Sequence, residues 1–113
     1  MPAGNHNFVI EQGATFSLTM TWKIDSNPVN LAGYTARLKA KPNLHRMAVL
    51  DWTTESGNIT LGGAAGTITF SMSAEETNTL RAGKYVYDLE LVSGTYVTRL
   101  LKGEITVQAN VTA

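Results

Sequence analysis

The residues best suited to chemistry are the two histidines, His6 and His45. His6 belongs to a polar N-terminal stretch and His45 to a loop, and neither has a second ligand near it at metal-binding spacing. A metal site needs several converging ligands, and a catalytic histidine needs a nucleophile and an orienting acid. We therefore predict no catalytic, cofactor-binding or metal-binding residue, no cofactor and no small-molecule substrate.

Two carboxylates, Asp88 and Glu90, occupy positions i and i+2 of an alternating run and so share one face of a strand. A glycoside hydrolase would need two such groups facing each other across a cleft. Arg99 and Lys102 on the following strand offer a plainer role, as cross-strand ion pairs worth about 0.2–1 kcal/mol each. We predict this structural role, and we expect the protein not to be an enzyme.

Residues 37–46 hold four of the nine basic residues, and residues 62–66 are rich in glycine. The basic segment could contact an acidic neighbour or nucleic acid, or it could be a solvated strand face whose lysines discourage aggregation. Because it has no interleaved aromatic residues and the whole chain has no net charge, we predict the solvated face and no nucleic acid partner. The glycine-rich stretch lacks the Gly-Lys-Ser/Thr ending of a phosphate loop, so we predict a hairpin loop.

Composition limits the classes to which the chain could belong. Its 113 residues, 43% hydrophobic and 16% charged, suit one folded domain. There is no cysteine, which excludes disulfides and thiol chemistry. The N-terminus has no cationic start followed by an apolar run, and no apolar stretch is long enough to span a membrane. We expect no signal peptide and no membrane partner.

Period-two alternation is the strongest pattern in the sequence. Residues 15–22 place Phe, Leu, Met and Trp at every even position and Thr or Ser at every odd one, which predicts a strand with a hydroxyl-lined face. Similar runs predict strands at residues 34–41, 67–72, 84–91 and 96–109, the last with a bulge or bend at Gly103. Shorter candidates are residues 8–11, 47–52 and 59–61.

Turn and cap residues lie between these runs. Ser93-Gly94-Thr95 joins two strong strands through a very short loop, which predicts an antiparallel hairpin. Ser73 and Glu76 form a capping-box pattern, which predicts a short helical turn near residues 73–80. We therefore expect an all-β fold, an antiparallel immunoglobulin-like β-sandwich of about seven to nine strands. Residues 1–6 are predicted to form a flexible N-terminal arm and residues 7–113 a single domain.

Three motifs carry a resemblance to a known group of proteins. They are Gln-Gly-Ala-Thr at residues 12–15, Leu-Ala-Gly-Tyr-Thr-Ala at 31–36 and Gly-Lys-Tyr-Val-Tyr-Asp-Leu at 83–89. With the surrounding sequence, over about residues 7–112, the chain resembles small virion proteins of tailed bacteriophages. It also resembles the immunoglobulin-like N-terminal domain of phage upper baseplate proteins.

The resemblance implies a structural role in the virion, in multiple copies, and supplies no active-site residue. Upper baseplate proteins continue into C-terminal extensions that bind receptor-binding proteins. Since this sequence stops at Ala113, we expect the anchoring module without the receptor-binding part. The expected protein is a non-catalytic structural or adaptor protein of the tail, baseplate or fibre attachment, a homo-oligomer (trimer or hexamer) docked to other virion proteins. It would be made in the host cytoplasm and located in the virion.

Two alternatives remain open. The first is a capsid decoration protein, because immunoglobulin-like folds occur on phage heads as well as tails. The second is a carbohydrate- or cell-surface-binding module, because β-sandwiches often bind glycans. Sugar binding usually needs exposed aromatic residues. Most aromatic residues of the alternating runs fall on predicted core faces, which leaves Trp52 and Tyr96 as the candidates for stacking on a sugar.

Overall fold

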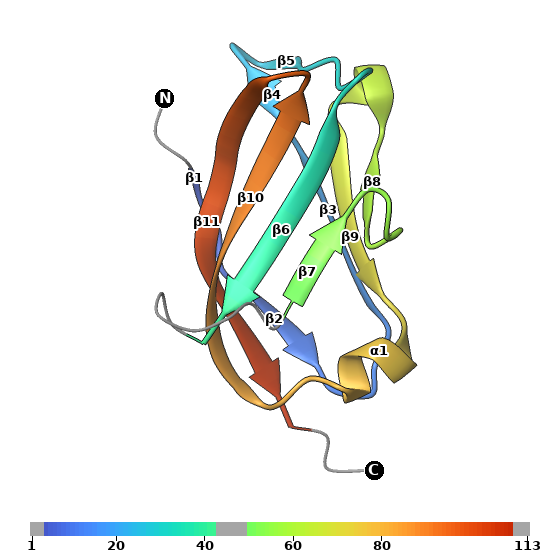
Figure 1. The fold of residues 1–113 in the computed structure, drawn as a ribbon, viewed down its shortest axis with the longest axis vertical. Coiled ribbons are helices and arrows are strands. Elements are labelled where there is room, and N and C mark those ends of the chain that lie inside the picture. Colours follow the sequence, from blue (N-terminus) through green and yellow to red (C-terminus); the bar gives the residue numbers. More distant parts are fainter. Residues whose placement is uncertain (1–3, 43–49, 110–113) are drawn as a thin grey trace.

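The alternating runs build two sheets that pack face to face (Figure 1). The computed structural model describes residues 4–42 and 50–109. In the larger sheet the strand order is β1-β11-β10-β6-β7, and β2 also pairs with β11. The bounds of these strands are Gly4–Asn5 (β1), Phe8–Glu11 (β2), Thr35–Lys41 (β6), Leu50–Thr53 (β7), Gly83–Ser93 (β10) and Tyr96–Gln108 (β11).

The smaller sheet has the order β3-β9-β8, with antiparallel pairing throughout. Its strands are Phe16–Thr21 (β3), Ile59–Leu61 (β8) and Thr67–Met72 (β9), and a 3₁₀ turn at Gly63–Ala65 joins β8 to β9. A two-residue ribbon, Lys23–Ile24 (β4) with Asn27–Pro28 (β5), extends from the end of β3. Asp25 and Ser26 both have positive φ there, the geometry that a tight two-residue hairpin requires.

The topology is that of an immunoglobulin-like sandwich. The strands β3, β9 and β8 take the places of strands B, E and D, while β11, β10, β6 and β7 take those of G, F, C and C′. The Tyr85 hydroxyl, near the start of β10, donates to the Arg81 carbonyl oxygen at 2.5 Å, which is the tyrosine corner of this fold. The predicted all-β, immunoglobulin-like sandwich is confirmed. It carries two additional parallel pairings, of β1 and β2 with β11.

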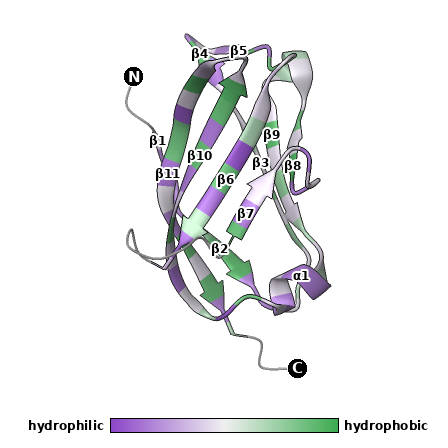
Figure 2. Ribbon diagram, viewed as in Figure 1, coloured by the Kyte–Doolittle hydropathy of each residue, from purple (hydrophilic) through white to green (hydrophobic). Residues whose placement is uncertain are grey.

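The core lies between the sheets and takes its residues from the predicted apolar faces (Figure 2). Phe70 of β9 is fully buried and lies 5.9 Å from the ring of Phe8 and 5.5 Å from the ring of Trp52. Trp52 is 2% exposed. The prediction that it could stack on a sugar is therefore wrong. A tryptophan on a short strand gives too little pattern to show which face it takes, and here it packs inward.

The hairpin and the capping box form as predicted. Strands β10 and β11 pair antiparallel from Ser93 opposite Tyr96 onward. The register shifts once, where Leu89 faces Leu101 and Glu90 faces Arg99, so the bulge lies at Leu100 and not at Gly103. The short helix α1 spans Ala74–Asn78, with both reciprocal hydrogen bonds of the capping box present.

The N-terminal segment is paired along the larger sheet over the residues that the structure describes. Gly4–Asn5, predicted to belong to a flexible arm, form β1 opposite Leu101 and Lys102 of β11. Residues 1–3 lie outside the described residues, as do 43–49 and 110–113. The predicted strand at 47–52 therefore overlaps the structure only from Leu50, where β7 begins.

Candidate functional site

The solvent-facing side of β6, β10 and β11 presents a grid of charged side chains, which we call the charged face. It forms because alternate residues of each strand point outward and the registers align them in rows. One row holds Lys39, Asp88 and Lys102, and the next holds Arg37, Glu90 and Arg99. A third row aligns Lys41, Val86 and Glu104.

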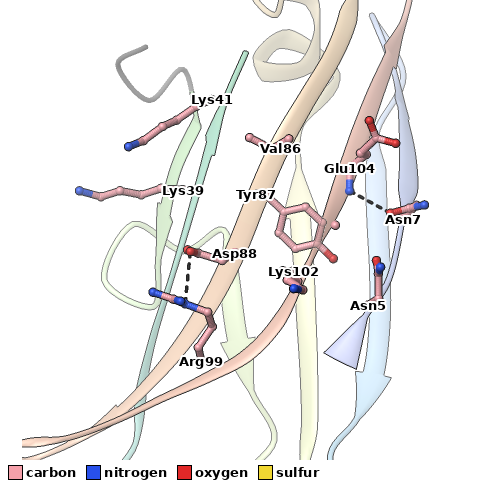
Figure 3. A pocket seen from close by; sticks show the side chains of 11 residues that line it. Asn5, Asn7, Lys39, Lys41, Val86, Tyr87, Asp88, Arg99, Lys102 and Glu104 are labelled. Atoms are coloured by element: carbon pink, nitrogen blue, oxygen red, sulfur yellow. Dashed lines mark hydrogen bonds and ion pairs between the residues drawn. The ribbon is translucent and has the colours of Figure 1, made fainter. Parts of the chain in front are cut away.

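Ion pairs occur within and between the first two rows. Arg37 Nε lies 2.7 Å from Glu90 Oε1 within the second row. Arg99 Nε of the second row lies 3.4 Å from Asp88 Oδ2 of the first (Figure 3). The predicted cross-strand role of Asp88, Glu90 and Arg99 is confirmed. Lys102 faces Asp88 in the register but makes no ion pair with the described residues.

The sequence pattern did not predict the ion pair between Arg37 and Glu90. Arg37 was assigned to a basic segment, and nothing in local spacing shows that β6 pairs with β10 rather than with a nearer strand. The alternation of both strands could have placed both side chains on solvent-facing sides, but only the register brings them together.

A shallow hollow of about 490 Å³ opens on the charged face beside the N-terminal strands. Its charged lining comes from Lys39, Lys41, Asp88, Arg99, Lys102 and Glu104. Figure 3 shows Lys39 and Lys41 extending side by side from β6, away from the ion pair of Asp88 with Arg99. None of the three lysines has an acidic partner among the described residues. The hollow can therefore offer cations to a carboxylate-bearing partner.

The other wall of the hollow is the crossing of the N-terminal segment over β11. The backbone passes so close to Gly103 that a Cβ there would overlap the carbonyl oxygen of His6. Asn7 Oδ1 accepts a hydrogen bond of 2.9 Å from the Glu104 N–H (Figure 3), and the Tyr87 hydroxyl donates to His6 O at 2.5 Å. Gly103 thus marks a close backbone approach, the other meaning of a glycine inside a strand.

Tyr87 is a buried titratable group beside this wall of the hollow. Its ring is buried and lies 5.2 Å from the ring of Phe8. Burial raises the pKa of the Tyr87 hydroxyl to about 12. The hydroxyl is therefore a neutral hydrogen-bond donor across the physiological range, which suits its structural bond to the His6 carbonyl.

The histidines do not form a site in the described residues. The His6 ring lies 6.3 Å from the ring of Phe8, and the His6 backbone carbonyl accepts the hydrogen bond from the Tyr87 hydroxyl. His45 lies outside the described residues, as does Arg46 of the basic segment. Residues 4–42 and 50–109 contain no group of three His, Asp or Glu residues that could hold a metal ion. The helices found in that part of the chain are too short to cross a membrane.

In the described part of the chain, the exposed large apolar side chains are Val9, Ile24, Tyr96 and Val97. Tyr96 and Val97, which follow the turn of the β10–β11 hairpin, are 69% and 48% exposed. Of the two aromatic residues considered for sugar stacking, Tyr96 is the one on the surface. The glycine-rich stretch at 62–66 forms the predicted hairpin connection, since β8 and β9 pair antiparallel on either side of it.

Comparison with known proteins adds little to this picture. The chain matches no protein-family model and no curated protein sequence. One solved structure, from a study of multimeric cell-adhesive interactions of VGSC beta subunits, is 13% identical with a TM-score of 0.45. That likeness covers 94% of this chain and 92% of the other. A likeness of this strength says nothing about function.

Proposed function

We propose that this chain is a non-catalytic structural or adaptor protein of a tailed-phage virion, in the tail, baseplate or fibre attachment. The charged face is the docking surface that we assign to it. The observation that carries the proposal is that Lys39, Lys41 and Lys102 stand on an exposed sheet face without acidic partners in the described part of the chain. An acidic neighbour would supply those partners.

The neighbouring hairpin end supports docking at the same side of the molecule. Protein interfaces are enriched in tyrosine and arginine, and their rims are polar and charged. Val97, which is 48% exposed, lies two residues before Arg99 on β11 and therefore shares the side of the sheet that carries the charged face, whereas Tyr96 next to it points to the other side. The resemblance of residues 12–15, 31–36 and 83–89 to phage virion proteins supports the location in a particle.

Mass spectrometry of particles purified on a density gradient tests the location. The cells that encode this chain are induced to release particles, and we expect the chain to co-purify with tail proteins in multiple copies. Complete absence of the chain from such particles would contradict the proposal. Recovery with the major capsid protein instead would favour a decoration protein of the head.

Charge reversal tests the surface. The double substitution Lys39→Glu with Lys102→Glu should abolish incorporation into particles, because it places carboxylates where an acidic partner would dock. Lys23→Glu on β4 is the matched control, an exposed reversal away from the charged face. Equal incorporation of the double variant and the control would remove the charged face from the proposal. A glycan array that gave hits lost in Tyr96→Ala would favour the carbohydrate-binding alternative.

A further inference from the structure

Strand β3 forms one edge of the smaller sheet, and no described strand pairs with its outer side. In constant-type immunoglobulin sandwiches the first strand of the chain pairs with the strand at this place. Here β1 and β2 pair with β11 of the opposite sheet instead. The six residues of β3 are therefore left with one unpaired backbone edge.

The phase of the ladder shows which backbone groups face outward. The Ser71 N–H of β9 donates to Asn58 O on the β8 side at 2.8 Å. Hydrogen-bonding directions alternate along an antiparallel strand, so the neighbours of Ser71 bond toward β3, where Leu18 lies opposite one of them. Ser17 and Thr19 consequently direct their N–H and C=O groups to the free edge.

The apolar side of β3 is incompletely covered. Phe16, Leu18 and Met20 pack against the core but are only partly buried, whereas the residues facing them on β9 are buried. A small hollow of about 100 Å³ opens at this edge, between the end of β3 and strand β11. Except for Thr21, the residues that line it are apolar: Met20, Trp22, Ile68, Leu100 and Leu101. An added strand would have both an unpaired edge and an apolar surface to cover.

The edge also lacks the features that protect sheet edges in monomeric proteins. Residues 14–22 contain no charged residue and no proline. The other edge strands are shorter, and two of them carry an acid: β2 has Glu11 and β7 has Asp51. A long, uncharged, alternating edge strand is a template for pairing with another chain.

We infer that β3 pairs with β3 of a second copy of this chain, antiparallel about a two-fold axis at Leu18. This register sets Ser17 opposite Thr19 of the other copy, so the outward backbone groups of both strands bond to each other. It places Phe16 beside Met20 of the other copy on the apolar side. A second copy is the occupant that fits, because the strand is self-complementary in this register and carries no charge that would repel itself.

The interface deepens the proposed function by naming how copies associate, and it stands on the geometry of β3 alone. A two-fold pair is compatible with a hexamer built from three pairs, but not with a ring of three subunits alone. If the purified chain did not dimerise, the virion location would be unaffected. If the chain were absent from particles, the dimer would still be measurable.

Sedimentation velocity of the purified chain over a concentration series tests the pairing. We expect a monomer–dimer equilibrium, and we expect Thr19→Pro to weaken dimerisation at least about tenfold. Proline there removes an outward N–H and leaves the backbone ladder to β9 intact, since proline is tolerated on edge strands. It also removes the exposed hydrogen bond of 3.0 Å between the Thr19 and Thr69 hydroxyls. Asp51→Pro on the β7 edge is the matched control and should dimerise like the unmodified chain.

A second variant keeps the test valid if the proline variant does not fold. Thr19→Lys places a charge near its own symmetry mate, and Thr60→Lys on β8 is its control on the same sheet face. The natural chain has no cysteine, so Ser17→Cys with Thr19→Cys should form a covalent dimer on oxidation. A monomer at every concentration, a dimer indifferent to both Thr19 variants, or a dimer that the double cysteine variant does not cross-link would each overturn the inference.

Discussion

Along β6, β10 and β11 most solvent-facing positions carry charges, whereas along β3 they carry only serine and threonine. The charged face lies on strands that are paired on both sides, and ion pairs form within and between two of its rows. Among the described strands, β3 has a partner on one side, β9.

Charge on this molecule is therefore not concentrated on the strand whose edge is unpaired among the described strands. The most vulnerable strand, β3, has no charged residue, while the densest charges cover strands that need no protection from pairing. We interpret the two regions as two kinds of contact surface. The charged face suits a partner of opposite charge, and the β3 edge suits another uncharged strand.

The largest effects should come from the core, where the centre of the smaller sheet can be compared with its edge. Phe70→Ala, at a fully buried position, should lower the free energy of unfolding by about 3–5 kcal/mol. Phe16→Ala on β3 should cost clearly less, because Phe16 is only partly buried in one copy. Urea denaturation of both variants at a concentration where the chain is monomeric provides the measurement. Equal losses would show that the β3 edge is as well covered as the centre.

A single added methyl group at Gly103 should disturb the pairing of the N-terminal strands β1 and β2 with β11. Gly103→Ala should displace the N-terminal segment from β11, because the added Cβ overlaps the His6 carbonyl. The expected loss is about 1–3 kcal/mol, typical of overpacking. Glu104→Ala, at an exposed neighbouring side chain, should change little. Hydrogen exchange should report loss of protection in residues 4–11 of the glycine variant alone, and unchanged protection there would contradict the close approach.

Alkaline pH should weaken the contact between the Tyr87 hydroxyl and the His6 carbonyl of the N-terminal segment. The pKa of Tyr87 is raised to about 12 in the folded chain from an ordinary value of 10. The folded state therefore holds its proton where the unfolded state loses it, so this stability is complete below pH 10 and is lost as pH rises toward 12. Thermal melts between pH 8 and about 11 should show a steeper alkaline loss for the natural chain than for Tyr87→Phe. Parallel curves would show that Tyr87 titrates normally.

The smallest effect should come from the charged face itself. Glu90→Gln removes the ion pair with Arg37. Both side chains reach solvent, since the Arg37 side chain is 49% exposed and the Glu90 side chain is 22% exposed. The expected loss is about 0.2–1 kcal/mol and should shrink in high salt. Urea denaturation at low and at high salt measures it. A loss of several kcal/mol would mean that the charged face holds the fold together instead of serving contact.

Local pattern was enough to predict most of the strands. Residues 8–11 and 59–61 form strands with the predicted bounds, and the alternating residues of β10 divide between core and solvent as expected. The capping box at Ser73 and Glu76 is likewise local, since its hydrogen bonds span three residues. The cross-strand ion-pair role of Asp88, Glu90 and Arg99 was predicted for the same reason, because strand faces repeat every second residue.

Within the long alternating runs, the two-residue period was enough to predict which residues face inward. Which strands become neighbours depends on the tertiary structure. It paired β1 and β2 with β11, placed the bulge at Leu100, buried Trp52 and joined Arg37 to Glu90. These outcomes depend on contacts between segments far apart in the chain. The open edge of β3 follows from them, because the strand that could have covered it lies on the other sheet.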